Sequence, residues 1–230
     1  MIIIALDVPS AAEARALVAS LGDAADFYKV GLELYAVAGM DFVRELKGQG
    51  KRVFLDLKLY DIGEQVKRAV AAISVSGVDF LTIHAVKQVM EAAVAGRGSS
   101  LKLLAVTVLT SFDENDVLDE GYALTLGELV EKRVGHAIEA GVHGIVCSSL
   151  EVAKVRAMTG PNMTLVIPGV RSAGKSAGDQ KRVATPAEAI ASGADYLVIG
   201  RQVTRAEDPR AELFKILDEI QTPLPAVTAR

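Results

Sequence analysis

Three charged residues lie close together in a hydrophobic stretch of the chain. Asp56 and Lys58 are two residues apart within the apolar run 53–60, and Asp61 follows that run directly. If the run is a strand, successive side chains point to opposite faces, so Asp56 and Lys58 share one face. Charges in such a place are unfavourable unless they are paired. The structural explanation is a simple ion pair between Asp56 and Lys58.

A chemical role explains this cluster better than a structural ion pair. An amine flanked by two carboxylates is held in its protonated form, because nearby negative charge favours the cation. Such a lysine is a poor base, but it is well placed to donate a proton and to stabilise a developing negative charge. We therefore expect Lys58 to act as a proton donor and electrostatic stabiliser, with Asp56 and Asp61 beside it.

Other polar residues follow apolar runs that we expect to be strands. Each has a structural alternative: Asp7 could cap a helix, Lys29 could extend its ammonium group to solvent, and His84 could be a core histidine. In a β/α barrel, however, the carboxyl ends of the strands meet at one mouth, where catalytic groups collect. The full set at expected strand ends is Asp7, Lys29, Asp56, Lys58, Asp61, His84, Thr110, Arg171 and Arg201.

The last two expected strands are followed by residues suited to an anion. One leads through Pro168 and Gly169 to Arg171, and the other leads into Gly200-Arg201. Glycines let backbone N–H groups approach an anion, arginine is a two-pronged donor, and barrels bind phosphate at these two positions. Two ordinary turns with surface arginines are the structural alternative, and we favour a phosphate site. The Gly- and Ser-containing loop from Arg171 to residue 182 is expected to fold over the phosphate as a lid.

Apolar runs and helical segments alternate about eight times along the chain. A single-domain eight-stranded β/α barrel, the TIM barrel of the α/β class, is the economical interpretation. A doubly wound open sheet is the alternative. The chain lacks Gly-x-Gly-x-x-Gly after its first expected strand, which counts against the dinucleotide-binding form of that sheet. The expected strands are 2–6, 27–32, 53–60, 78–84, 101–109, 144–147, 163–167 and 195–199.

Length and composition restrict the class of protein. The 230 residues, half of them apolar, fit one barrel domain over 1–230, with a loose tail at 222–230. A net charge of −4 without a basic run argues against nucleic acid as a partner. The apolar runs are too short to span a membrane and the N-terminus lacks signal-peptide features. The one cysteine, Cys147, excludes a disulfide framework. We therefore expect a cytoplasmic protein.

No metal site is indicated by the sequence. The three histidines, His84, His136 and His143, are scattered along the chain. Asp56 and Asp61 could hold Mg²⁺, but Lys58 between them already supplies positive charge. We therefore expect a site that uses an ammonium group in place of a metal or an organic cofactor.

Seven stretches make the chain similar to the orotidine 5′-phosphate decarboxylase family, over nearly the whole length to about residue 220. The central Asp-x-Lys-x-x-Asp motif is shared with related sugar-phosphate decarboxylases, whereas Arg171, Gln180 and Gly200-Arg201 narrow the resemblance to this family. The matching stretches are 4–7, 29–31, 54–59 with 61–62, 107–111, 168–171, 179–180 with 182–186, and 200–201.

The resemblance implies a homodimer that converts orotidine 5′-phosphate to UMP and CO2 without metal or organic cofactor. Lys58 would protonate C6 of the pyrimidine, Asp56 would lie beside the scissile carboxylate, and Asp61 would enter the site of the neighbouring subunit. Lys29 would complete the catalytic charge array. The implied substrate-binding residues are Asp7, Lys29, Asp56, Gln65, Thr110, Pro168, Arg171, Gln180, Gly200 and Arg201.

The chain departs from the family pattern at a few positions after Lys58. Tyr60 stands where histidine is common, and Gln65 stands where a substrate-contacting threonine is usual. Two other functions remain open. One is a decarboxylase or aldolase-like enzyme that acts on a keto-sugar phosphate, which would usually need Mg²⁺. The other is a catalytically silent barrel that binds UMP-like nucleotides.

Overall fold

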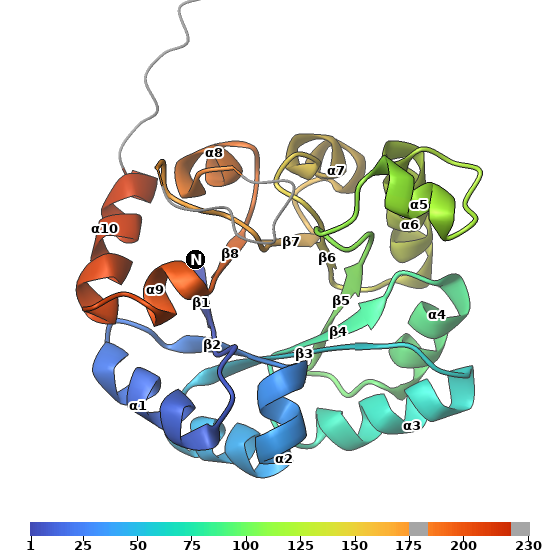
Figure 1. Ribbon diagram of the computed structural model, residues 1–230. Coiled ribbons are helices and arrows are strands. Elements are labelled where there is room, and N and C mark those ends of the chain that lie inside the picture. Colours follow the sequence, from blue (N-terminus) through green and yellow to red (C-terminus); the bar gives the residue numbers. More distant parts are fainter. Residues whose placement is uncertain (175–183, 222–230) are drawn as a thin grey trace, which may run out of the picture.

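The computed structural model describes residues 1–174 and 184–221, which form a closed barrel of eight parallel strands (Figure 1). The strands follow chain order around the barrel, and pairing of the first strand with the last closes it. The predicted TIM barrel is therefore confirmed, and the open-sheet alternative is wrong. The strands are β1 (Ile2–Ala5), β2 (Phe27–Gly31), β3 (Arg52–Leu59), β4 (Phe80–His84), β5 (Lys102–Val106), β6 (Gly144–Val146), β7 (Thr164–Ile167) and β8 (Tyr196–Ile199).

Helices surround the strands on the outside of the barrel (Figure 1). Their starts follow capping signals in the sequence. Ser10 accepts a hydrogen bond from the backbone N–H of Glu13, and Thr185 forms a capping box with Glu188. The helices are α1 (Ala11–Leu21), α2 (Leu32–Gly48), α3 (Gly63–Ser74), α4 (Lys87–Gly96), α5 (Glu114–Asp119), α6 (Leu126–Ala140), α7 (Val152–Thr159), α8 (Pro186–Ala191), α9 (Arg201–Thr204) and α10 (Pro209–Gln221).

Aromatic side chains seal the amino-terminal end of the barrel interior. Phe27, Phe80 and Tyr196 are the first residues of β2, β4 and β8. Their rings pack edge to face, with the Phe27 and Phe80 centroids 5.1 Å apart and the Phe80 and Tyr196 centroids 5.2 Å apart. The guanidinium of Arg52 lies 4.0 Å from the Phe27 ring centroid. A ligand cavity is therefore expected at the other end, where the strands finish.

Two strands, β5 and β3, differ from the sequence prediction in ways that matter for the site, whereas the carboxyl ends of β1, β2 and β6 differ by one residue. β5 stops at Val106, three residues before the expected end at position 109. β3 pairs regularly with β4 up to Leu55, and its register then shifts before Leu59 pairs with Ile83. A uniform alternation of side chains along 53–60 is therefore wrong, because a bulge interrupts the strand where Lys58 lies.

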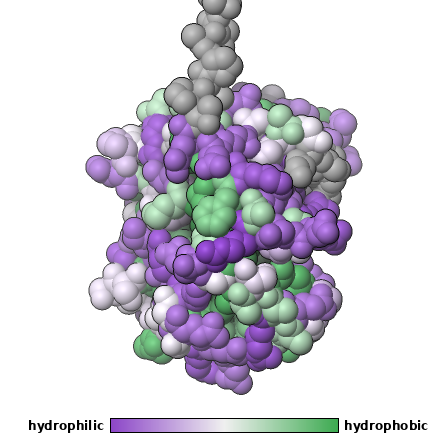
Figure 2. Space-filling model, turned by 90° about the vertical axis from the view of Figure 1, so that its left-hand side faces the viewer, coloured by the Kyte–Doolittle hydropathy of each residue, from purple (hydrophilic) through white to green (hydrophobic). Residues whose placement is uncertain are grey.

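The outer face that carries α1 and α10 is mostly hydrophilic, with a small apolar group in its middle (Figure 2). On α10, Phe214 is 45% exposed, and the Arg210 guanidinium lies 5.5 Å from its ring centroid. Among the described helices, none is both long and apolar enough to cross a membrane. The expected tail at 222–230 and most of the expected lid, residues 175–182, lie outside the described residues.

Candidate active site

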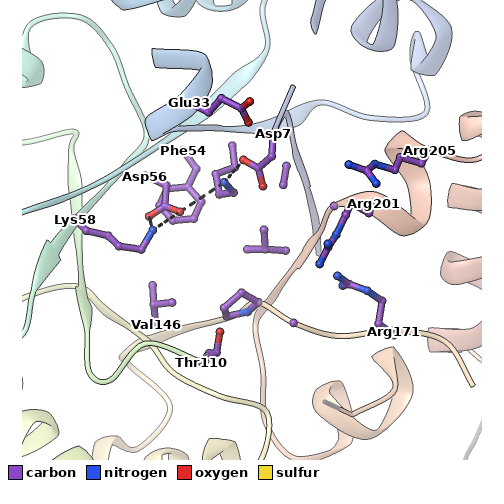
Figure 3. Close-up of a pocket in the computed structure, with 16 residues that line it drawn as sticks. Asp7, Glu33, Phe54, Asp56, Lys58, Thr110, Val146, Arg171, Arg201 and Arg205 are labelled. Carbon is purple, nitrogen blue, oxygen red and sulfur yellow. Dashed lines mark hydrogen bonds and ion pairs between the residues drawn. The ribbon is translucent and has the colours of Figure 1, made fainter. Parts of the chain in front are cut away.

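A cavity of about 420 Å³ opens at the carboxyl ends of the strands. Its lining includes Ala5, Phe54 and Val198, which belong to one buried apolar cluster. Charged side chains from both sides point into it (Figure 3). The structure brings nine of the residues predicted from the sequence together in this one space. They are Asp7, Lys29, Asp56, Lys58, Thr110, Pro168, Arg171, Gly200 and Arg201.

Four side chains along one wall form a chain of alternating charge. Lys58 Nζ lies 2.9 Å from Oδ1 and 3.0 Å from Oδ2 of Asp56. Lys29 Nζ lies 3.6 Å from Oδ2 of Asp56 and 2.7 Å from Oδ1 of Asp7. Because the side chains of Lys29 and Asp56 are only 9% and 13% exposed, these contacts are weakly screened by solvent. Each cation therefore holds its neighbouring carboxylates in place.

Gly31 explains how the chain makes room for these charges. It ends β2 two residues after Lys29. A Cβ atom at this position would lie 2.9 Å from Asp7 Oδ1 and 2.9 Å from Lys29 Nζ. Any larger side chain would therefore displace the ion pair between Lys29 and Asp7.

Lys58 occupies an unusual backbone conformation. Its φ of 48° is the one positive value among the non-glycine residues that the structure describes. The left-handed region costs an L-residue about 1–2 kcal/mol, so surrounding contacts must hold it. The Thr82 hydroxyl holds the Lys58 backbone, because it accepts a hydrogen bond of 2.9 Å from the Lys58 N–H. The same hydroxyl donates a hydrogen bond of 2.8 Å to Asp56 Oδ1. The bulge in β3 thus directs the Lys58 amine toward Asp56.

Electrostatics keep Asp56 ionised in the cavity wall. Burial acts to raise the pKa of its carboxyl group. The ammonium groups of Lys29 and Lys58, with hydrogen bonds from Lys58 and Thr82, outweigh burial and hold that pKa below its ordinary value. The site therefore presents a fixed carboxylate next to a potential proton donor.

Arginines gather on the opposite side of the cavity. Arg171, Arg201 and Arg205 lie across the space from Asp56 and Lys58 (Figure 3). Arg171 follows β7 and is 8% exposed, and its Nη1 donates a hydrogen bond of 2.7 Å to its neighbour's carbonyl oxygen. The other two lie at the start of α9 and directly after it. Three guanidinium groups around one space suit an anion such as phosphate.

The sequence matches a family model described as the Orotidine 5'-phosphate decarboxylase / HUMPS family over residues 1–216. The chain belongs to this family. The resemblance predicted from the sequence motifs is therefore confirmed.

Individual members of the orotidine 5′-phosphate decarboxylase family match nearly the full chain. The chain is 51% identical over 220 residues to orotidine 5'-phosphate decarboxylase from Methylorubrum extorquens (strain PA1), covering 96% of this chain and 95% of that protein. It is 52% identical over 220 residues to the decarboxylase from Rhodopseudomonas palustris (strain BisA53), covering 95% and 94%. A crystal structure of the Lactobacillus acidophilus decarboxylase aligns with a TM-score of 0.84 at 36% identity, covering 96% of this chain and 99% of that chain.

Some residues predicted from the sequence, by strand-end position or by the family motifs, do not line this cavity. Asp61 is exposed, and its Oδ1 accepts a hydrogen bond of 2.7 Å from the Ile62 backbone N–H. Gln65 is exposed on α3. His84 ends β4 but faces a separate cavity of about 180 Å³, where its ring centroid lies 5.5 Å from that of Tyr60. The predicted phosphate ligand Gln180 lies outside the described residues.

The sequence interpretation missed three residues of the site. Arg205 and Glu33 line the cavity, and Thr82 holds the Lys58–Asp56 pair from beneath. A signal existed for Thr82, because it is a lone hydroxyl within the apolar run of β4. Arg205 comes four residues after Arg201, beyond the expected strand end, and no spacing argument singled it out. Within 1–174 and 184–221, no cluster of three or more His, Cys, Asp or Glu side chains is arranged to hold a metal ion.

Proposed function

We propose that this protein is a carbon–carbon lyase that decarboxylates orotidine 5′-phosphate to UMP and CO2 in de novo pyrimidine biosynthesis. Family membership and the full-length similarity to named decarboxylases support the proposal. The observation that carries it is the arrangement of charge: a lysine gripped by a carboxylate lies across one cavity from three arginines. That arrangement suits a substrate whose reacting carboxylate lies beside Lys58 and whose phosphate lies beside the arginines.

The chemistry requires stabilisation of a carbanion. When the bond between C6 and the carboxylate breaks, its electron pair stays on C6, where no conjugated group can accept it. The Lys58 ammonium stabilises this charge electrostatically and then transfers a proton to C6, and its amine later regains a proton from solvent. Asp56 lies beside the scissile carboxylate, and the repulsion between the two is relieved when neutral CO2 leaves. Lys29 holds Asp56 in place. No step needs a metal or an organic cofactor.

The remaining residues bind the other parts of the substrate. Asp7 and Lys29 bind the ribose hydroxyls, Thr110 contacts the pyrimidine, and Pro168 lines the base pocket. Phosphate binding far from the reacting carbon stabilises the closed, water-excluded state, so it contributes to turnover as well as to affinity. The proposed phosphate ligands are Arg171, Gln180, Gly200 and Arg201. Gln65 lies outside the cavity of its own chain, so its proposed substrate contact, like that of Asp61, is to the neighbouring subunit's substrate.

The proposal includes a homodimer in which Asp61 enters the neighbouring subunit's site. Leu32, Tyr60 and Ile62 are 60%, 68% and 71% exposed, and they follow the paired strands β2 and β3 at the cavity rim. Exposed apolar residues grouped beside an active site are typical of a protein interface. The same proposal places the protein in the cytoplasm, a reducing compartment where Cys147 can remain a free thiol.

A CO2-release assay with orotidine 5′-phosphate tests the function. We expect turnover that resists EDTA, and a loss of more than about 10³-fold in kcat for Lys58→Ala with UMP binding retained. An activity that depends on Mg²⁺ and acts on a keto-sugar phosphate would favour the related sugar-phosphate enzyme. UMP binding by the wild type without CO2 release would indicate a silent nucleotide-binding barrel. Decarboxylation retained in Lys58→Ala would exclude Lys58 as the proton donor.

A further inference from the structure

A buried carboxylate lies outside the cavity, on α10, the helix that follows Arg201 and Arg205 in the chain. Glu212 on α10 is 6% exposed and has no place in the chemistry described above. A carboxylate in such a position is unfavourable unless hydrogen bonds compensate for lost water. Its Oε1 accepts a hydrogen bond of 3.1 Å from Nε2 of Gln202, and Lys215 Nζ lies 3.4 Å from its Oε2. Glu212 therefore connects α10 to a side chain of α9.

Gln202 in turn holds the loop that leaves β7. Its Oε1 accepts a hydrogen bond of 3.0 Å from the backbone N–H of Ser172, and its Nε2 donates one of 2.8 Å to the Ser172 hydroxyl. Gln202 directly follows Arg201, and Ser172 directly follows Arg171. A two-point contact between the neighbours of the two arginines fixes the separation of the backbone segments that carry them.

Glu212 determines which way the Gln202 amide points. The two ends of an amide differ little in shape, so the partners decide its orientation. A carboxylate only accepts hydrogen bonds, so it keeps Nε2 on its own side and leaves Oε1 toward the Ser172 N–H. If the amide were reversed, an acceptor would face Glu212 and a donor would face the Ser172 N–H. The acceptor oxygen of Glu212 thus sets the orientation of the hydrogen bonds that span the two arginine segments.

We propose that Gln202 and Glu212 are positioning residues that hold Arg171 and Arg201 at the spacing a phosphate group requires. This inference rests on the phosphate role proposed above for the two arginines. Neither Gln202 nor Glu212 lines the cavity, so both act through the arginine segments. A small displacement of a binding group weakens an interaction that depends on direction, and bidentate arginine contacts depend on it strongly.

Two leucine variants test the positioning role. Gln202→Leu and Glu212→Leu keep a side chain of similar size but remove the bridging hydrogen bonds. We expect each to raise the Kd of UMP by about fivefold, with a similar rise in KM for orotidine 5′-phosphate and a smaller change in kcat. Tm should stay near that of the wild type for Glu212→Leu, because Lys215 is 75% exposed and remains solvated, and Gln202 Nε2 keeps its hydrogen bond to the Ser172 hydroxyl.

Glu212→Gln is the matched control. Its carboxamide oxygen can still accept the hydrogen bond from Gln202, although the charge and the contact with Lys215 are lost. We expect a Kd for UMP close to that of the wild type. The difference between the Gln and Leu variants at position 212 therefore isolates the hydrogen bond from the charge. Isothermal titration calorimetry measures the Kd of UMP for each variant independently of turnover.

Arg201→Ala, measured in parallel, separates this inference from the proposed function. If Arg201→Ala leaves the Kd of UMP unchanged, the phosphate role itself fails. If Arg201→Ala weakens UMP binding while both leucine variants bind UMP as the wild type does, the positioning role is overturned. A lowered Tm in the leucine variants without a change in Kd overturns it as well, because the network would then serve the scaffold alone.

Discussion

Lys58 combines the proposed chemistry with a positive φ, the one such value among the described non-glycine residues. A left-handed conformation in a lysine persists only where neighbouring contacts hold it, and such residues gather at functional sites. Here the same contacts that hold the backbone also orient the carboxylate partner: the Thr82 hydroxyl bonds to the Lys58 N–H and to Asp56. The proton donor is therefore positioned through its main chain as well as through its ammonium group.

His84 shows that a position at a strand end does not by itself place a residue in the active-site cavity. It ends β4, as predicted, yet it packs against Tyr60 outside the charged cavity. Burial, with the positive charges of Arg133 and Lys58, lowers the pKa of His84 from its ordinary value of 6.5. Its position outside the charged cavity and its weakened basicity therefore fit a structural role better than that of a general base.

The lowered pKa of His84 predicts a dependence of stability on pH. The folded protein binds this proton more weakly than the unfolded chain does, so the free energy of unfolding falls as pH drops through about 6.5. The fall ends once His84 is protonated in the folded state as well. Denaturant unfolding between pH 7.5 and about 5 should show a smaller loss for His84→Gln than for the wild type. An NMR titration midpoint for His84 at or above 6.5 would contradict the assignment.

At the scale of elements, the contact between β3 and β4 shapes the site. The Thr82 side chain is fully buried, and its hydroxyl replaces regular strand pairing where the register shifts. A threonine in this place satisfies the Lys58 N–H that the bulge would otherwise leave without a partner. The irregularity in the strand is thus stabilised by one side chain from its neighbour.

Thr82→Val tests this arrangement with almost no change in shape. The substitution leaves the Lys58 N–H without a partner and removes one of the two hydrogen bonds to Asp56 Oδ1, which should cost about 1–3 kcal/mol in the free energy of unfolding. Because Lys58 is then less well held, kcat for CO2 release should fall by about tenfold or more. Thr82→Ser keeps the hydroxyl and serves as the control, with kcat near that of the wild type. Equal kcat values for the Val and Ser variants would show that the hydroxyl does not position Lys58.

The alternation of elements could be predicted from the sequence because it depends on local patterns. Apolar runs, capping residues such as Ser10 and Thr185, and glycines after helices mark the eight units without any tertiary information. The bulge at Lys58 could not be predicted, because a period of two assumes regular pairing with a neighbour whose register is set in three dimensions. Arg205 and Gln202 were missed for a similar reason, since their roles depend on which loops meet.

At the scale of the whole molecule, the proposed homodimer predicts that the site of one barrel is completed by a second. The cavity contains Lys58 and Asp56 but not Asp61, which lies exposed beyond β3. Exposed apolar side chains, Tyr60 and Ile62 among them, flank Asp61 in the sequence. A second copy that covers this rim would bury the apolar groups and could bring its own carboxylate to the lysine. Two-fold pairing would then complete both sites at once.

Subunit mixing measures whether the site is shared. Lys58→Ala and Asp61→Asn should each be nearly inactive alone, and mixed dimers should regain activity, because one of their two sites receives an intact lysine and an intact aspartate. Equal mixing with free exchange yields hybrids as about half of the dimers, so about one quarter of wild-type CO2 release is expected. A tagged pair, purified as the hybrid, should reach about one half. If exchange is shown by the tags and activity does not return, Asp61 serves its own chain and the shared site is wrong.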